Sequence, residues 1–280
     1  MNIKGHTTSE QDLAAAILAP LTTPSDDFFC LGLQSKPGKG KTTGVVRTFP
    51  NVVVLDFDKK LPPGTASFPF WDHDWVLRTF PKERHMTAEG KEVVNVRDAL
   101  LTFSRTQIKK LPPGGTLLVD SCTMVSMAFD RVSMAFPERY GDQSGFVMKY
   151  YSHKLTYSTE ILQNFKSYRG HVVVTFHEQD ERNKNGIVIG TKPLASGQMA
   201  DKAGAFFTSF FRAEILTNPE DPLKPFFVWR VAPSDEFTAI RPPGFDMSKL
   251  PTFPNAENPK NPHKYYILQD FKELCRCCGK

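Results

Sequence analysis

The sequence predicts an α/β protein with a mostly parallel central sheet, helices on both faces and antiparallel strands toward the C-terminal side. Three observations predict this class. Continuous β-branched runs of strand length recur along the chain, helix-compatible stretches separate them, and a Gly-rich turn follows the first run. In such sheets ligands bind beyond the carboxyl ends of the strands, so the residues that follow each strand are the first candidates for a site.

Length and composition agree with one soluble domain. The chain has 280 residues, of which 40% are hydrophobic and 23% are charged, which is ordinary for a globular protein. The longest apolar runs are strand-sized, and the first residues lack the apolar stretch of a secretory signal. We therefore expect a cytoplasmic protein without a membrane span. The net charge of +5 permits a polyanionic partner, but the Lys and Arg residues are dispersed along the chain.

The first elements surround the Gly-rich turn. Residues 9–19 predict a short helix that Pro20 ends, and residues 27–33 form an apolar run that leads straight into the turn. A helix is expected from Lys41 onward. Residues 51–56 predict the next buried strand, which ends in acidic residues.

The middle of the chain repeats the alternation. Residues 61–92 are rich in Pro, Gly, aromatic and charged residues, which predicts a long insertion. A helix is expected over 93–111, a strand over 116–120, and a second buried strand over 171–176. The residues between these two strands, 121–169, predict helices with a polar break at 141–145.

Shorter strands are expected in the last third, at 187–189, 226–231 and 237–240, where they would pair antiparallel at the side of the sheet. After Pro242 the chain reads as loop, with one final ordered segment over 265–274. The resulting plan has three parts: an N-terminal helix and linker (1–24), a core (25–245) and a C-terminal extension (246–280).

Five cysteines are too few and too unevenly placed for a disulfide framework. Cys30 and Cys122 lie in apolar runs and are expected to act as small hydrophobic residues. Cys275, Cys277 and Cys278 predict an exposed tail, and a metal site formed by these three thiols is the alternative.

The segment from Ser35 to Thr43 has the pattern of a phosphate-binding loop. Such a loop needs consecutive backbone N–H groups in a concave turn with a helix N-terminus behind it, and Gly residues make room for that turn. Here Pro37, Gly38, Lys39 and Gly40 supply the turn, and Lys36 precedes it within the candidate loop. Lys41 would reach the β- and γ-phosphates, and the Thr42 hydroxyl would bind Mg²⁺, as in the G-x-x-x-x-G-K-[ST] pattern. Ser35 stands where the first Gly is usual.

Polar residues at the ends of later strands complete the candidate site. Asp120 ends an apolar strand and is the expected metal-side carboxylate. Asp56 and Asp58 follow the strand after the phosphate-loop helix, and Asp58 is the better candidate for orienting the attacking water. The alternative is that both are solvated turn residues. His177 follows the strand at 171–176, where it would either sense the nucleotide or cap the strand.

These segments resemble the RecA-like recombinase core in order and spacing, over residues 25–241, and the small phage ATPases of the Sak type, which are linked to single-strand annealing, look closest. The resemblance implies that Asp58 is the catalytic carboxylate, that Asp120 ends the Walker B strand, and that His177 is a polar sensor. Asp58 stands where RecA carries Glu, and His177 where it carries Gln. These departures predict slow hydrolysis.

The resemblance also implies a basic residue supplied by a neighbouring subunit, because the developing phosphate charge needs a cation. Arg241 resembles that residue, and its rivals are Arg182, Lys192, Lys202 and Arg212. Residues 179–186 resemble a nucleotide-responsive loop of the kind that contacts single strands, although no aromatic residue accompanies their charge.

The first functional hypothesis is therefore a P-loop ATPase that uses ATP and Mg²⁺ in phage-type DNA recombination or replication, in the host cytoplasm. Its expected partners are single-stranded DNA or a DNA-bound annealing protein, and further copies of itself in a ring or filament. A nucleotide-gated loader or assembly switch with little turnover is the second hypothesis. A small-molecule phosphotransferase is the third, although no acceptor pocket can be located.

Overall fold

The computed structural model describes residues 28–86, 90, 92–135, 147–195, 200, 203–233, 248 and 250–279. Three predicted features lie outside these residues: the helix at 9–19, the polar break at 141–145 and the strand at 237–240. No helix in the part of the chain that the structure describes is long and apolar enough to cross a bilayer.

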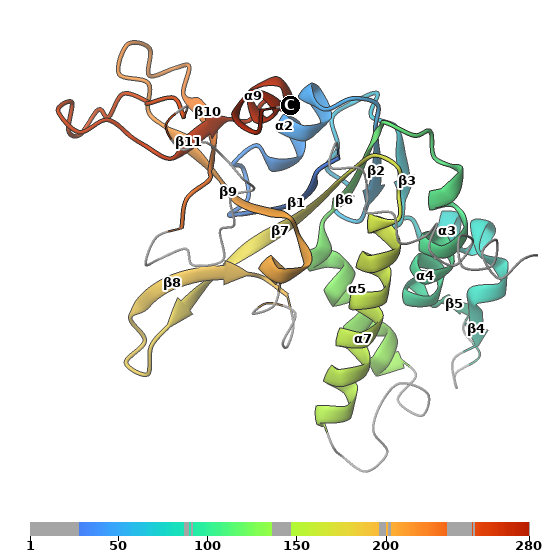
Figure 1. The fold of residues 1–280 in the computed structure, drawn as a ribbon. Helices are drawn as coiled ribbons and strands as arrows, with labels where there is room; N and C mark the ends of the chain where they lie inside the picture. The colour runs from blue at the N-terminus through green and yellow to red at the C-terminus, as the bar shows by residue number, and fades with distance from the viewer. Residues whose placement is uncertain are drawn as a thin grey trace, which may run out of the picture.

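One large sheet organises the molecule (Figure 1). Its strands are β1 (Cys30–Ser35), β2 (Val52–Asp56), β3 (Ser67–Pro69), β6 (Thr116–Asp120), β7 (His171–Arg182), β8 (Val188–Pro193), β9 (Ser209–Leu216), β10 (Phe226–Arg230) and β11 (Tyr266–Leu268). The strand order is β11-β10-β9-β1-β7-β6-β2-β3, with β8 paired to β7. Strands β9, β1, β7, β6, β2 and β3 are parallel, whereas β8, β10 and β11 pair antiparallel. The predicted fold class is confirmed.

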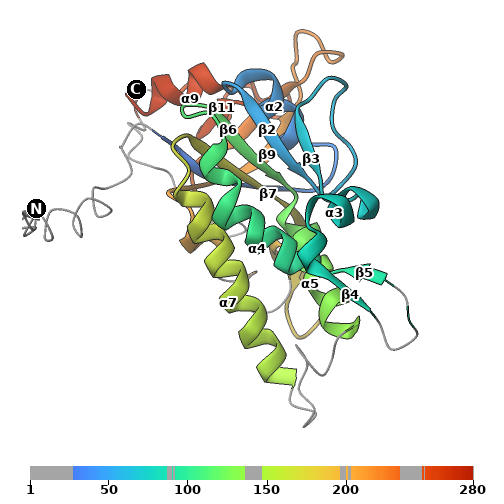
Figure 2. The same cartoon turned by 90° about the vertical axis from the view of Figure 1, so that its right-hand side faces the viewer.

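Helices cover both faces of this sheet. They are α2 (Lys41–Thr48), α3 (His73–Thr79), α4 (Val96–Thr106), α5 (Cys122–Ala135), α7 (Val147–Lys166) and α9 (Phe271–Cys277). Figure 2 shows α2 and α9 on one side of the sheet and α4, α5 and α7 on the other. The core is divided in the same way, because one buried cluster includes side chains of α4, α5 and α7 and another includes side chains of α2 and α9.

Alternation along the strands explains the two cores. In β7, the side chains of Val172 and Val174 enter the cluster of α4, α5 and α7, whereas Val173 enters the cluster of α2 and α9. Successive residues of a strand point to opposite faces, so a continuous apolar run is what a strand covered on both sides requires.

The carboxyl ends of the central strands meet at one edge. In the parallel ladders, Asp56 is paired with Asp120, and Ser35 is paired with His177. The first residue of α2, the last residue of β6 and the turn after β2 are thereby brought to the same region. This edge carries the candidate site.

The helix predicted over 93–111 is shorter than expected. Residues Glu92–Val94 form a strand, β5, which pairs with β4 (Arg84–Met86), and the helix α4 begins only at Val96. The reason is local, since the Asn95 side chain accepts a hydrogen bond from the backbone N–H of Asp98 and caps the helix there. The β-branched pair Val93 and Val94 is then free to pair with β4.

The polar segment 179–186 was predicted as a loop, but its first half, 179–182, is strand, which corrects the prediction. Strand β7 continues through Arg182 because β8 pairs with it antiparallel, and only residues 183–187 form the turn. In Figure 1 this ribbon extends away from the rest of the sheet. The strand predicted at 187–189 begins at Val188 and continues to Pro193.

Two peripheral segments join the sheet. The predicted insertion at 61–92 contains β3, which extends the parallel sheet beyond β2, and α3, which Asp72 caps. In the predicted C-terminal extension, β11 pairs with β10, and α9 packs against the core with Leu274 and Cys277. The three C-terminal cysteines therefore do not lie on an exposed tail, since Cys277 is buried and Cys275 and Cys278 pack beside it.

Candidate functional site

The phosphate loop lies between β1 and α2 and depends on two glycines. Gly38 and Gly40 have φ angles of 80° and 81°, which side-chain-bearing residues rarely adopt. Gly40 is also the N-cap of α2 and provides no side-chain cap. The backbone N–H groups of the first helical turn are thus not shielded by a capping side chain, which is the arrangement that an anion at a helix N-terminus needs.

Lys41 is buried at the base of this loop and bonds to Ser35. Its Nζ donates to the Ser35 carbonyl oxygen at 3.0 Å and to Ser35 Oγ at 2.8 Å. The Ser35 hydroxyl in turn donates to the Lys36 carbonyl oxygen at 2.8 Å. The serine that replaces the usual first Gly therefore accepts hydrogen bonds from the lysine when no phosphate is bound.

Burial lowers the pKa of Lys41 to about 8, because the cation loses solvation, and the charges of Asp120, Glu178 and Asp58 oppose this effect. The Lys41 ammonium group is thus largely desolvated, although three carboxylates lie near enough to stabilise its charge. An incoming polyphosphate would supply the missing negative charge at close range.

Asp120 lies beside the phosphate loop at the end of β6. Its Oδ1 accepts a hydrogen bond of 2.6 Å from Thr175 Oγ1, and its carboxylate also interacts with the Thr42 side chain. Burial raises the pKa of Asp120, while the Thr175 hydrogen bond opposes that rise. Thr42 and Asp120 place a hydroxyl and a carboxylate together, and these oxygen donors are the ones that Mg²⁺ prefers.

Asp58 and His177 meet at the same edge of the sheet, although Asp58 follows β2 and His177 lies inside β7, beside Ser35, where it does not cap the strand. Asp58 Oδ2 lies 3.1 Å from His177 Nε2, and Asp58 Oδ1 accepts a hydrogen bond of 3.2 Å from Ser121 Oγ. The Asp58 side chain is only 9% exposed. Thr123 Oγ1 fixes the backbone of His177 by accepting its N–H at 2.9 Å. Asp58 is therefore not a solvated turn residue.

Asp56 has a different environment, although it is only two positions away. Its Oδ1 accepts the backbone N–H groups of Asp58 and Lys59, at 3.1 and 2.9 Å, and its Oδ2 accepts Trp71 Nε1 at 2.8 Å. These three bonds shape the turn after β2. We infer that Asp56 holds the turn, whereas Asp58 faces the site.

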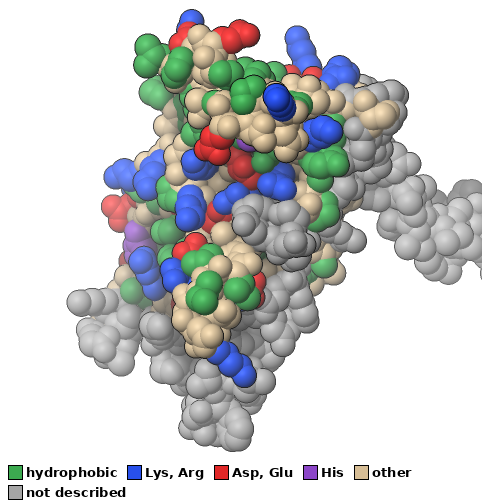
Figure 3. Space-filling view, turned by 90° about the vertical axis from the view of Figure 1, so that its left-hand side faces the viewer, with side chains coloured by type: hydrophobic (Ala, Val, Ile, Leu, Met, Phe, Trp, Pro, Cys, Tyr) green, Lys and Arg blue, Asp and Glu red, His purple; other side chains and the backbone are tan. Residues whose placement is uncertain are grey.

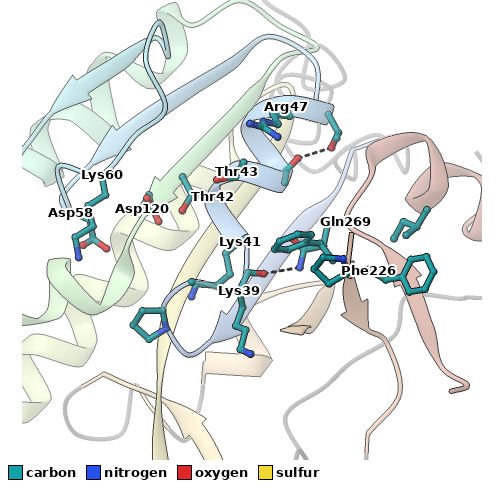
Figure 4. Close-up of a pocket in the computed structure, with 18 of the residues that line it drawn as sticks. Lys39, Lys41, Thr42, Thr43, Arg47, Asp58, Lys60, Asp120, Phe226 and Gln269 are labelled. Carbon is teal, nitrogen blue, oxygen red and sulfur yellow. Dashed lines mark hydrogen bonds between the residues drawn. The ribbon is translucent and has the colours of Figure 1, made fainter. Parts of the chain in front are cut away.

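A cavity of about 610 Å³ connects these residues (Figure 4). Its walls include the phosphate loop, the first turns of α2, Asp58, Asp120 and His177. The opposite wall comes from the last part of the sheet and was not predicted from the sequence; it consists of Pro225, Phe226, Phe227, Leu268 and Gln269. No motif marks these residues. The only available signal was the run of aromatic residues at the start of the β10 segment.

A match to the sequence model of a known family shows to which family this chain belongs. The sequence model of a family described as AAA domain matches residues 29–209, which is more than half of the chain. The chain belongs to this AAA domain family. The matched region runs from the start of β1 to the start of β9, so it contains the phosphate loop, Asp58, Asp120 and His177. Within the matched region the phosphate-loop pattern lies between a strand and a helix, which is the context that nucleotide binding requires.

Solved structures give more distant similarities. A prototypical ATPase from the type III secretion system of pathogenic bacteria matches with a TM-score of 0.40 and 11% identity, over 66% of this chain and 52% of its own. The chain thus spans about half the length of that protein. The RadB recombinase matches with a TM-score of 0.36 and 13% identity, over 72% of this chain and 80% of its own. No curated protein matches the sequence.

The candidate trans-acting basic residues differ in whether the structure describes them and in which groups they contact. Arg241 and Lys202 lie outside the described residues. Arg212 is already paired inside this chain, where its Nε donates to the buried Glu178 at 2.6 Å and its Nη1 donates to Glu214 at 2.9 Å. Arg182 lies at the end of β7 and bonds to Asp180, and Lys192 lies on β8. Arg212 is therefore the least suited of the described rivals to reach another subunit.

We expect binding of metal-free nucleotide to weaken as the pH rises through the pKa of Lys41. Below pH 8 the lysine of the free protein is protonated and ready to pair with phosphate; above it, binding must include uptake of a proton. The Kd for ADP in the presence of EDTA should be flat below pH 7.5 and then increase by about tenfold per pH unit. Fluorescence titration between pH 6.5 and 9.5 measures this. A Lys41→Ala profile should be flat, and an equally steep profile in that variant would contradict the assignment.

Proposed function

We propose that the protein is a Mg²⁺-dependent ATPase with slow turnover. The observation that carries the proposal is the cavity in which Asp58, held by His177 and Ser121, shares walls with Lys41 and Asp120. ATP hydrolysis needs a phosphate cradle, a cation for the transferred phosphoryl group and a carboxylate near the attacking water. These groups come from four segments of the chain and meet in one place.

Each residue has a proposed role. The phosphates are surrounded by the loop and the start of the helix, which consist of Ser35, Lys36, Pro37, Gly38, Lys39, Gly40 and Thr43. Lys41 pairs with the β- and γ-phosphates. Thr42 and Asp120 would hold Mg²⁺, for which their oxygen atoms are suited. When bound, the metal neutralises charge on the phosphates. Asp58 orients the attacking water, and His177 responds to the terminal phosphate.

The contacts of Asp58 support slow turnover. Both of its carboxylate oxygens already take part in hydrogen bonds, one to Ser121 and one to His177. Each carboxylate oxygen can accept one further hydrogen bond, so the attacking water must share Asp58 with these two neighbours, which restrict how the carboxylate can turn toward it. The same observation favours the second candidate function, a nucleotide-gated loader or assembly switch that binds ATP and rarely hydrolyses it.

The biological setting is the finer part of the proposal. We propose a role in phage-type DNA recombination or replication, with single-stranded DNA or a DNA-bound annealing protein as partner and a ring or filament as the working form. The resemblance of the strand-end residues to the RecA-like core supports this role, and Arg241 is the proposed trans-acting residue. On the face shown in Figure 3, Lys and Arg side chains are interspersed with acidic and apolar ones, which favours contact through a partner protein over a continuous DNA groove.

The experiment that tests this proposal is ATP hydrolysis by the purified protein with Mg²⁺, with and without single-stranded DNA. Lys41→Ala is the blank. Hydrolysis that single-stranded DNA stimulates, and that the blank lacks, is the expected result. Tight ATP binding without turnover in either condition would move the assignment to the switch. ADP formation that requires an added small acceptor would instead indicate a phosphotransferase.

A further inference from the structure

Gln269 connects the end of the chain to the phosphate loop. It follows β11, and its Nε2 donates to the carbonyl oxygens of Lys39 at 2.9 Å and Val228 at 3.0 Å. The residue is 7% exposed and lines the cavity. Figure 4 shows its side chain reaching the loop. Because two carbonyl groups occupy the two N–H groups of Nε2, the orientation of the carboxamide is fixed.

The glycines of the loop make room for this contact. A Cβ atom at Gly40 would lie 2.7 Å from Gln269 Oε1, and one at Gly44 would lie 2.9 Å from it. Gly40 also needs its positive φ, but Gly44 lies inside α2 with ordinary helical geometry. Glycine inside a helix costs about 1 kcal/mol relative to alanine. The close approach of Gln269 accounts for a glycine that the helix itself does not favour.

The bond to Lys39 also orients the next N–H group of the loop. In a planar trans peptide the carbonyl and the N–H group point in opposite directions. By holding the Lys39 carbonyl toward the C-terminal strands, Gln269 keeps the Gly40 N–H directed the other way. An anion cradle depends on such N–H groups converging, and an arrangement fixed before binding avoids the cost of ordering the loop.

We propose that Gln269 is a positioning residue for the phosphate loop, acting through the Lys39–Gly40 peptide. It lies outside the residues that match the AAA domain family, 60 positions beyond their end. The C-terminal strand pair β10 and β11 is then part of the nucleotide site and not an appendage to it. This inference rests on the proposed nucleotide-binding function.

The test uses Gln269→Met, which keeps the length of the side chain and removes its N–H donors. Two ligands are titrated, ATP and inorganic tripolyphosphate, because the second lacks the base and the ribose. The Kd for both should increase by about tenfold, whereas kcat should change by less than about threefold. Lys272→Met is the matched control, since Lys272 is exposed on α9 in the same segment and should leave both Kd values unchanged.

A second variant keeps the inference testable if Gln269→Met does not fold. Gly44→Ala favours the helix but pushes against Gln269 Oε1, so it should weaken tripolyphosphate binding in the natural chain. In a Gln269→Ala background the same Gly44→Ala change should have a clearly smaller effect, because the contact with Oε1 is gone and only the tight contact with the Cβ of residue 269, at 3.1 Å, remains. Tripolyphosphate affinity that is unchanged in both single variants would overturn the inference. Failure of the natural chain to bind ATP and tripolyphosphate would instead overturn the proposed nucleotide site.

Discussion

Lys41→Ala should lower kcat/KM for ATP hydrolysis by about 100- to 1000-fold, because no other group at the base of the phosphate loop replaces its cation during phosphoryl transfer. The ligand-free variant should nevertheless unfold at the same temperature as the natural protein or slightly above it. The depressed pKa of Lys41 means that burial of the cation opposes folding at neutral pH, so its removal relieves a cost.

Steady-state phosphate release and a thermal melt measure the two quantities on the same sample. Lys110→Ala is a suitable control, because Lys110 is exposed at the end of a short 3-10 helix before β6, at the opposite end of the strands from the cavity. A Lys41→Ala protein that keeps more than a tenth of the natural activity would show that the hydrolysis occurs elsewhere.

The second large effect is expected from Asp58→Asn. The amide keeps the size of the side chain but cannot accept a proton, so kcat should fall by about 100-fold or more. ATP affinity should change by less than about threefold, since the loop, Lys41 and Asp120 are untouched. Single-turnover hydrolysis and equilibrium binding separate the two effects.

Asp56→Asn is the matched control for this prediction. One of the two Asn side-chain positions would present an N–H group to donors that now bond to Asp56, either Trp71 Nε1 or the backbone N–H groups. This variant should lose about 1–3 kcal/mol of stability. Its melting temperature should fall by more than that of Asp58→Asn, because the Ser121 hydroxyl and the His177 ring beside Asp58 can accept a hydrogen bond as well as donate one. If Asp58→Asn hydrolysed ATP at the natural rate, the proposed role of Asp58 would be wrong.

The sequence was informative where function depends on residues close together in the chain or at the ends of buried strands. The phosphate loop is continuous, and Asp58, Asp120 and His177 each follow an apolar run of strand length, so parallel strand order alone brings them to one edge. The strand and helix pattern of the core was predictable for the same reason. Local signals also decide the start of α4, where Asn95 is a cap that the prediction overlooked.

The opposite wall of the cavity could not be predicted, because it depends on long-range packing. The hydrogen bond from Gln269 to Lys39 joins residues 230 positions apart, and Gln269 carries no motif. Similarly, the pairing of Arg212 with Glu178 depends on the order of β7, β1 and β9 in the sheet, which a basic residue in a sequence does not reveal. The polar end of β7, residues 179–182, is a strand only because β8 pairs with it, so its sequence alone resembled a loop.

The central position of β1 has a consequence for the order in which the molecule forms during synthesis. Cys30 pairs with Val172 on one side, and Leu31 pairs with Ser209 on the other. The ribosome must therefore produce most of the chain before this strand has either neighbour, and such distant pairings make folding slow. Its carboxyl end carries the phosphate loop, so nucleotide cannot stabilise the early nascent chain and can contribute only to the last steps of folding.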